Sequence, residues 1–314
     1  MRVWRPIVAA CCGLGIAGAA LAAATFDYGL KAKEIAEGVH LFEGRMEHFT
    51  RENGGNIVNT GYLETSAGAV VIDTGPSRRY GEQMRAAIEK QTGKGIAQVF
   101  VTHAHPDHFL GDQAFASDTL SALPATRAAI QTGGDDLAAN LYRMVGGWME
   151  GTEAVAPAHD AKPGPIVIGG RALRLLALAG HTGADLAVYD EKTRTLFAGD
   201  LVFFQRAPTT PNADIGQWLS ALDQLEKIDF AVLVPGHGPV VKDKTAIAQT
   251  RAYLRWLRTA LQGAARQGLD PTEAMQIQVP AEFAKLAVLQ EEFQRSVVHL
   301  YPAMELETLK KAPH

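Results

Sequence analysis

The chain has 314 residues, of which 47% are hydrophobic and 20% are charged, and its formal net charge is −4. This composition is typical of a globular protein with a substantial core and excludes the disordered and fibrous classes. The acidic balance also argues against a nucleic-acid partner, which normally meets a basic protein face. No linker-like stretch divides the interior, so one large domain is the simplest organisation.

The first 24 residues have the pattern of an export signal. Two arginines precede an apolar run from Ile7 to Leu21, and alanine-rich sequence follows it. The run is short and interrupted by glycines, which favours a cleaved signal over a membrane anchor. We therefore expect residues 1–24 to be a signal peptide and residues 25–314 to form a periplasmic or secreted domain with no stable membrane anchor.

Both cysteines, Cys11 and Cys12, lie in this apolar run. The cleaved chain would therefore contain no disulfide, no thiolate metal ligand and no cysteine nucleophile. Lipid modification of Cys11 would leave too short an apolar region for export. Cleavage also removes two arginines and no acids, which leaves 28 basic against 34 acidic residues and a net charge of −6.

Two strands, Val39–Glu43 and Asn56–Glu64, are expected next, with the polar loop Met46–Gly55 between them. This loop could cover a site or could be a solvated hairpin tip.

A strand, an aspartate-containing turn, a helix and a second strand then follow, and the same order occurs again later in the chain. Such units favour parallel strand pairs whose carboxyl ends collect polar residues. The first unit comprises Ala69–Asp73, Arg79–Gln91 and Val99–Thr102, and the second comprises Thr195–Ala198, Gly216–Ile228 and Ala231–Val234.

The stretch Ala125–Met149 between the two units is expected to be helical, with Gly133 and Gly134 separating two helices. Hairpins and terminal helices complete the chain, and the apolar residues of the last helices are expected to pack in the core. The hairpins are expected over Pro165–Leu178 and Leu186–Ala198, and the helices over Lys244–Arg266 and after Thr272.

The strongest functional signal is the segment from His103 to His108, His-Ala-His-Pro-Asp-His. Histidine and aspartate lose hydration on burial and need strong partners, which a metal ion supplies. His103 and His105, two apart in extended backbone, can face one ion. The turn at Pro106 can direct Asp107 and His108 toward another.

This segment resembles the signature of the metallo-β-lactamase superfamily, and three later motifs follow in the family's order over almost all of the mature chain. The resemblance implies a mixed fold of helices and strands, α/β (α+β). Its layers form an αββα four-layer sandwich, with C-terminal helices from about residue 244. The later motifs are Gly180-His181-Thr182, Gly199-Asp200 and Gly236-His237-Gly238.

The resemblance also implies a ligand set for two zinc ions, although manganese or iron would suit the same donors. Asp73 resembles an aspartate that orients the ligand loop in the family; the less favoured alternative is a polar turn residue. Among the other histidines, only His48 draws attention, because its loop lies where related enzymes carry a substrate-covering flap. The implied ligands are His103, His105 and His181 for the first ion, Asp107, His108 and His237 for the second, and Asp200 as the bridge.

The function implied is hydrolysis of a small ester, thioester, lactone or amide-like substrate by a hydroxide shared between the two metal ions. Asp107 would position the second ion and help to orient the nucleophile. Asp200 resembles the aspartate of glyoxalase II-like thioesterases and of lactonases; zinc β-lactamases have cysteine or serine near this position, so a β-lactam substrate is disfavoured. Phe49–Gly61 and Ile72–Gly81 resemble exported zinc metallohydrolases associated with quinoprotein relay and sulfur-oxidation systems.

Other functions stay open at this point. A persulfide dioxygenase-like oxidoreductase would hold one Fe²⁺ through His103, His181 and Asp200. A non-catalytic accessory protein of a quinoprotein system would retain the site without using it. A nuclease is disfavoured by the acidic charge.

Overall fold

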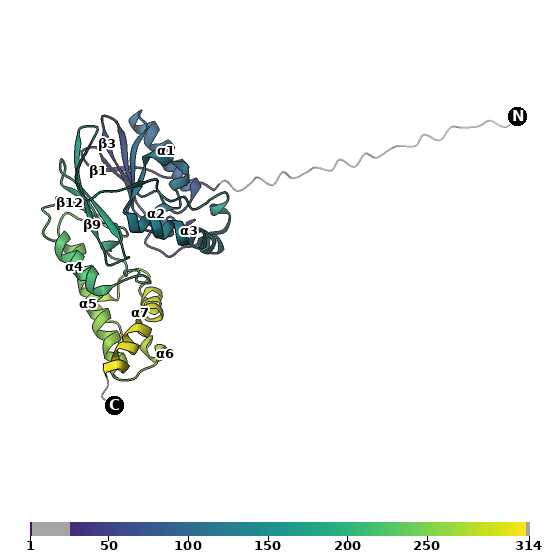
Figure 1. Ribbon diagram of the computed structural model, residues 1–314. Helices are drawn as coiled ribbons and strands as arrows, with labels where there is room; N and C mark the ends of the chain where they lie inside the picture. Colours follow the sequence, from purple (N-terminus) through teal and green to yellow (C-terminus); the bar gives the residue numbers. More distant parts are fainter. Residues whose placement is uncertain (2–25, 312–314) are drawn as a thin grey trace.

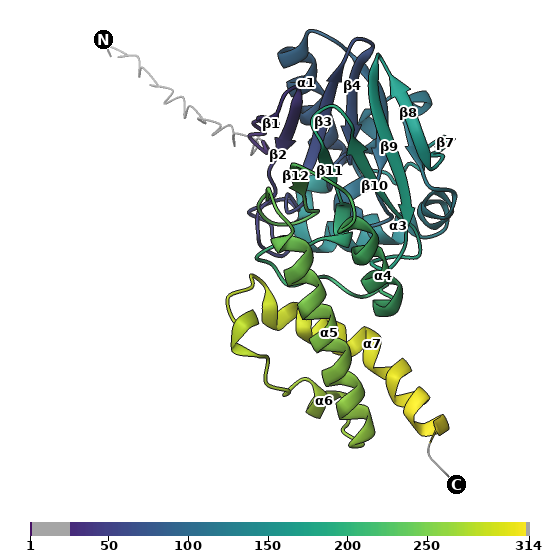
Figure 2. The same cartoon turned by 90° about the vertical axis from the view of Figure 1, so that its left-hand side faces the viewer.

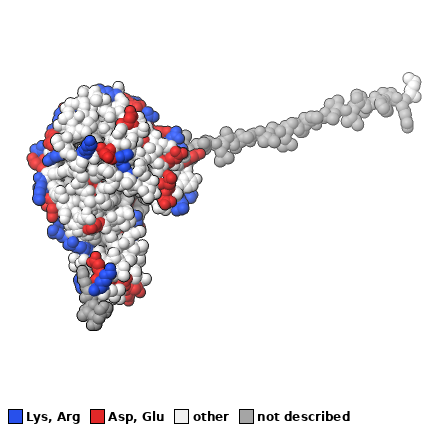
Figure 3. Space-filling model, viewed as in Figure 1, with Lys and Arg blue, Asp and Glu red and all other residues white. Residues whose placement is uncertain are grey.

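The computed structural model describes Met1 and residues 26–311, so all of the predicted signal peptide except Met1, and both cysteines, lie outside the described residues. Two β-sheets pack face to face and helices cover their outer faces, which gives the expected four-layer α/β sandwich (Figure 1). None of the helices in this described part is long and apolar enough to span a membrane. On the face seen in Figure 3, acidic and basic side chains are interspersed.

The first sheet has seven strands in chain order, of which β1 to β4 are antiparallel neighbours and β4 to β7 are parallel neighbours. These strands are β1 (Lys33–Ala36), β2 (Val39–Phe42), β3 (Thr60–Thr65), β4 (Gly68–Ile72), β5 (Ile96–Val101), β6 (Leu120–Ala122) and β7 (His159–Asp160). The second sheet has the order β12 (Val232–Val234), β11 (Thr195–Phe197), β10 (Asp185–Asp190), β9 (Arg171–Leu178) and β8 (Gly164–Ile168).

The described residues form seven α-helices, of which five lie against the sheets. Helices α1, α2 and α3 lie on the first sheet, and α4 and α5 lie on the second (Figures 1 and 2). Their bounds are α1 (Arg78–Thr92), α2 (Pro106–Phe109), α3 (Pro124–Val145), α4 (Ile215–Leu225), α5 (Thr245–Arg266), α6 (Pro271–Ala274) and α7 (Leu289–Lys311).

Strand β4 shows why the sheets pack in this way. All five of its residues are buried, because one face meets the second sheet and the other meets α1. Val70 shares the inter-sheet core with Val188 of β10, whereas Val71 packs with Met84 and Ile88 of α1. An uninterrupted apolar strand is therefore the pattern that this position requires.

The two strand–helix–strand units predicted from the sequence are confirmed. Strands β4 and β5 are parallel neighbours joined by α1, and β11 and β12 are parallel neighbours joined by α4. Asp73 and His103 follow the carboxyl ends of the first pair, and Asp200 and His237 follow those of the second. The sandwich thus places four of the polar residues singled out in the sequence at one end of the two sheets.

The C-terminal helices project beyond the sandwich, where α7 crosses α5 (Figure 2). Phe283 and Phe293 are buried in the same core as Trp218 of α4 and Tyr253 of α5. The prediction that the apolar residues of the last helices pack in the core is confirmed for both phenylalanines.

Two sequence-based boundaries were wrong. Strand β3 begins at Thr60 and not at Asn56, because the preceding residues turn toward the second sheet: Asn59 donates from its amide nitrogen to the carbonyl oxygens of Pro235 and Gly238. Gly133 and Gly134 do not separate two helices, because both lie inside the continuous helix α3.

The two glycines of α3 should respond oppositely to alanine. A Cβ on Gly133 would meet nothing within 4 Å, so Gly133→Ala should raise the free energy of unfolding by about 0.5–1 kcal/mol through helix propensity. A Cβ on Gly134 would lie 2.8 Å from the Cβ of Ala154, so Gly134→Ala should lower it by about 1 kcal/mol. Urea denaturation of both variants measures the difference, and equal shifts would contradict this packing.

Candidate metal centre

The seven residues predicted as metal ligands meet at the end of the sandwich where the parallel strands terminate. Each lies in a short connection or a short helix directly after a strand, so the sheets fix its position. His103 and His105 follow β5, Asp107 and His108 lie in α2, His181 lies between β9 and β10, Asp200 lies in a 3₁₀ turn after β11, and His237 follows β12.

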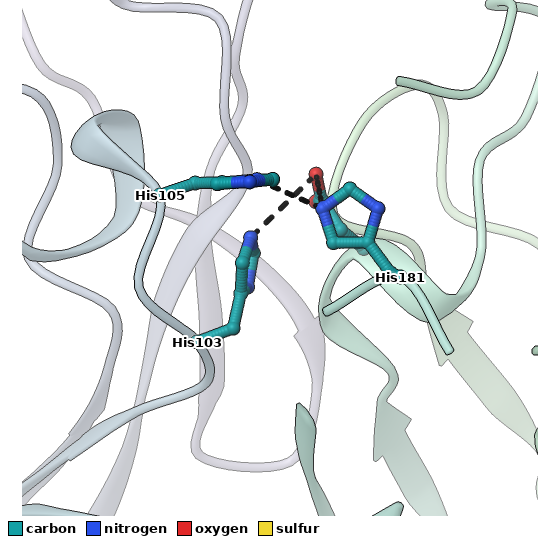
Figure 4. Close-up of side chains that lie close together, drawn as sticks. His103, His105 and His181 are labelled. Carbon is teal, nitrogen blue, oxygen red and sulfur yellow. Dashed lines mark hydrogen bonds and ion pairs between the residues drawn. The ribbon is translucent and has the colours of Figure 1, made fainter. Parts of the chain in front are cut away.

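His103, His105, His181 and Asp200 form a first cluster, whose potential ligand atoms all lie within 4.8 Å of one another. The Nε2 atom of His181 lies 2.9 Å from Nδ1 of His105 and 3.3 Å from Oδ2 of Asp200. Figure 4 shows the three imidazoles converging from two separate connections. This arrangement can hold one metal ion.

Asp107, His108 and His237 form a second cluster of the same compactness. Nε2 of His237 lies 3.4 Å from Oδ2 of Asp107. Asp200 reaches this cluster as well, because its Oδ1 lies 3.2 Å from Nε2 of His108 and its Oδ2 lies 3.3 Å from Nε2 of His237. The Asp200 carboxylate therefore stands between the two clusters, where one group can serve both.

The donor atoms fit a cation better than they fit one another. Nε2 of His103 is buried and has no hydrogen-bond partner among the described residues. Buried Nε2 of His108 and Oδ1 of Asp200 form an ion pair at 3.2 Å but make no hydrogen bond of good geometry. A buried polar atom without a partner costs about 1–3 kcal/mol. Cations that accept imidazole and carboxylate donors, such as zinc, would satisfy these atoms.

Four of the five imidazoles are oriented through their other ring nitrogen, as is usual for metal-binding histidines. Their partners come from outside the ligand motifs, and Asn212 among them was not anticipated from the sequence. His103 Nδ1 lies 3.0 Å from Oγ1 of Thr102, His105 Nε2 lies 3.0 Å from Oδ1 of Asn212, His108 Nδ1 lies 2.7 Å from Oδ2 of Asp73, and His237 Nδ1 lies 2.8 Å from the carbonyl oxygen of Ile57.

Asp73 occupies the orienting position that the resemblance implied, and it is 1% exposed. Its carboxylate accepts hydrogen bonds from the backbone nitrogen and Oγ1 of Thr102, at 2.7 and 2.9 Å, and pairs with His108. Its φ of 59° lies in the left-handed region, which few non-glycine residues adopt. Asp73 thus accepts local backbone strain while it fixes the start of the ligand segment.

The buried charges determine which protonation states the site favours. Burial lowers the pKa of His103 and of His181 well below the usual range, which leaves neutral rings suited to bind a cation. Burial also opposes the charge of Asp200, but nearby histidines, with His237 foremost, outweigh it and hold the pKa of this carboxyl well below its usual range.

His108 differs from the other rings. Burial alone would lower its pKa, but the carboxylates of Asp200, Asp73 and Asp107 outweigh burial and raise it well above the usual range. A cation that binds His108 must therefore displace a proton, so metal binding should release protons at neutral pH.

A cavity of about 320 Å³ opens onto both clusters. Its lining includes His48 and Phe49, so the polar loop Met46–Gly55 borders the site and is not only a solvated hairpin tip. Sequence reasoning missed Arg206 and Arg295, which also line the cavity. The remaining lining residues are Ile57, His105, Pro106, Asp107, Asn140, Met144, Asp200, Thr209, Pro211, Asn212 and His237.

Replacing Asp73 by asparagine should weaken metal affinity by about 10–100-fold, because one acceptor oxygen becomes an amide donor facing Thr102 or His108. Asparagine tolerates the left-handed backbone, so the turn itself should survive. Competition with a chromophoric chelator measures the affinity.

Asp112→Asn is the matched control. Asp112 is also fully buried, and burial raises its pKa well above the usual range, so an amide closely replaces its neutral carboxyl. Equal loss of metal affinity in both variants would contradict the orienting role of Asp73.

A family model described as the metallo-beta-lactamase superfamily matches residues 53–237. The Beta-lactamase-like protein 2 homolog of Caenorhabditis elegans is 25% identical over 185 residues, which is 58% of this chain and 56% of that protein. The linear primary-alkylsulfatase of a Pseudomonas species is 22% identical over 283 residues, which is 76% of this chain and 53% of that protein. An atrochrysone carboxyl ACP thioesterase of Aspergillus fumigatus is 25% identical over 192 residues, 59% and 52% of the two chains. The chain spans about half the length of these relatives.

Solved structures show the same fold. The metallo-beta-lactamase from Pontibacter korlensis superposes with a TM-score of 0.58 at 23% identity, over 72% of this chain and 99% of that one. The metallo-beta-lactamase IND-7 gives a TM-score of 0.58 at 22% identity, over 72% and 98% of the two chains. The family model covers more than half of the chain and spans all seven of the clustered residues, and the chain therefore belongs to the metallo-β-lactamase superfamily.

Proposed function

We propose that this chain is a dinuclear zinc-dependent hydrolase of small ester, thioester or lactone substrates. The observation that carries the proposal is the pair of complete ligand clusters, with Asp200 between them, at the floor of one cavity. A pair of bound zinc ions would supply Lewis-acid activation of water and of a substrate carbonyl group.

The chain's own residues would divide the remaining work. His103, His105 and His181 would hold the first ion, and Asp107, His108 and His237 the second, with Asp200 shared. Asp107 is 5% exposed and lines the cavity, so its carboxylate stands where it can orient a nucleophile toward the substrate. Asp107 is therefore the ligand that we assign a catalytic role.

The second cluster favours the dinuclear function over the iron alternative. A mononuclear Fe²⁺ oxidoreductase would need only His103, His181 and Asp200. It would leave buried Nε2 of His108 without a cation, paired only with the carboxylates of Asp200 and Asp107 at 3.2 and 3.9 Å. A second ion would give these donors a partner, which supports the dinuclear proposal.

Several observations support an acyl or related ester substrate. Aspartate stands at the bridging position, which disfavours a β-lactam, and two relatives are named as a thioesterase and an alkylsulfatase. The segments that resemble the quinoprotein-associated subgroup surround the centre, since Ile57 and Asp73 orient ligand histidines. We therefore propose an exported, periplasmic or secreted enzyme of that subgroup with a small-molecule substrate.

Elemental analysis of protein purified without added metal should find about two zinc ions per chain, and removing them with a chelator should abolish thioester or lactone hydrolysis until zinc is restored. About one iron per chain, with no hydrolysis, would instead favour the oxidoreductase.

Asp107→Asn should reduce the zinc content from two toward one and lower the hydrolytic rate by about 100-fold or more, because it removes both a ligand charge and a proton acceptor at the cavity. Asp118→Asn, at an exposed position, is the control with the same chemical change. Full activity with two zinc ions in Asp107→Asn would remove Asp107 from the proposed site.

A further inference from the structure

The loop Met46–Gly55 reaches the cavity through His48 and Phe49, both of which line it. We propose that Tyr28 holds this loop as a fixed wall of the cavity. Tyr28 would then be a positioning residue for the substrate, although it lies outside the cavity lining. The inference rests on the proposed hydrolase function and adds a residue to the groups that serve it.

Within the loop, Asn53 fixes the backbone beside the two lining residues. Asn53 is 3% exposed, and its amide nitrogen donates to the carbonyl oxygen of His48 at 2.7 Å. Its Oδ1 accepts from the backbone nitrogens of Thr50 and Gly55, at 3.0 and 2.9 Å. An asparagine that bonds to nearby backbone groups in this way stabilises a tight turn. The loop is therefore folded on itself, and its position depends on the contacts that it makes with other segments.

Tyr28 joins this loop to the turn that begins at Asp73. Its hydroxyl donates to the carbonyl oxygen of Gly54 at 2.9 Å. Because that bond uses the single hydroxyl hydrogen, the hydroxyl of Ser77, 2.8 Å away, donates to Tyr28. Burial raises the pKa of Tyr28, so this hydroxyl keeps its proton at neutral pH. One phenol thus links the cavity wall to the turn that orients His108.

Trp148 holds the same loop at a second carbonyl group. Its Nε1 donates to the carbonyl oxygen of Arg51 at 2.8 Å, and the centroid of its ring lies 4.4 Å from that of Tyr28. Gly54 passes so close to the indole that a Cβ at this position would lie 2.4 Å from the ring atom Cδ2. Aromatic rings in such contact stabilise one another beyond their burial. Tyr28 and Trp148 therefore form an aromatic clamp on the loop.

The segment that carries Tyr28 is itself fixed on α1. Oε1 of Gln83 accepts from the backbone nitrogen of Tyr28 at 2.9 Å, and Nε2 of Gln83 donates to the carbonyl oxygen of Phe26 at 3.1 Å. The ring of Phe26 lies 5.1 Å from that of Trp148 and 5.3 Å from the guanidinium of Arg79. A wall anchored in this way does not have to be ordered when substrate binds, which saves affinity.

Tyr28→Phe tests the clamp, because it removes the hydroxyl and keeps the ring. Trypsin cleavage after the exposed Arg51 should be about tenfold faster in this variant, since loss of the hydrogen bond raises the population of the open loop. Cleavage after Arg85 in α1 should keep its rate. Tyr189→Phe is the matched control, because it removes a tyrosine-to-carbonyl hydrogen bond on β10, and it should change neither rate.

A pair of thiols shows whether the clamped wall serves the substrate site. Thiolates bind zinc directly, so phenylmethanethiol and 2-mercaptoethanol share one anchor, and only the first has a ring that can lie against Phe49. Calorimetric titration of the zinc-loaded wild-type protein should give a dissociation constant about tenfold lower for phenylmethanethiol. In Tyr28→Phe this preference should shrink by about threefold, with the zinc content and the affinity for 2-mercaptoethanol unchanged.

The outcomes separate the clamp from the metal centre. Unchanged cleavage after Arg51 in Tyr28→Phe, or a preference for the ring that is absent from the wild type or undiminished in the variant, would overturn the inference and leave the dinuclear centre intact. Loss of zinc from Tyr28→Phe would also overturn it, because Tyr28 would then act on the ligand turn and not on the wall. A wild-type protein that holds no metal and binds neither thiol would overturn the proposed hydrolase function, and the positioning role with it.

Discussion

The rest of this structure depends on one electrostatic constraint, which is the gathering of four buried imidazoles, one half-buried imidazole and two buried carboxylates around a common point. Such groups are costly to desolvate, and several of their donor atoms lack partners within the described protein. Hydrogen bonds from other segments orient these groups toward one another. The partners are Asp73, in its strained turn, Asn212 and the backbone carbonyl of Ile57. The two sheets bring the groups together, and bound cations would balance their charges.

The strand–helix–strand units and the polar segment from His103 to His108 were evident in the sequence itself, whereas the four-layer fold and the full set of seven ligands were what the family resemblance implied. The apolar strand β4 and the helical spacing of Met84 and Ile88 predicted layers that the structure confirms. The segment His103–His108 places four donors within six residues, so its role as a metal-binding segment could be predicted from the sequence, although the orientation of its rings depends on residues elsewhere. A turn residue such as Asp73 required the family resemblance, since its partners lie on other loops.

What the sequence did not disclose depends on contacts between distant segments. Arg206, Asn212 and Glu292 carry no motif, and their positions emerge only when α7 folds back against the connection after Asp200. The helix break predicted at Gly133 and Gly134 was wrong for the same reason. Gly134 lets Ala154 approach α3 closely, so the glycine is explained by tertiary packing and not by a helix end. For such residues, the role predicted from neighbouring sequence differed from the role that the contacts in the folded chain show.

Each ligand cluster draws on both sheets, with His103 and Asp107 from the first and His181 and His237 from the second. Neither sheet alone, folded in isolation, would offer a complete set of donors. Metal binding by a complete cluster therefore requires the two halves to be docked across the inter-sheet core. If folding follows export, the ion would be drawn from the compartment in which docking occurs, so the metal supply of that compartment, as well as the donor set, would decide which cation the protein carries.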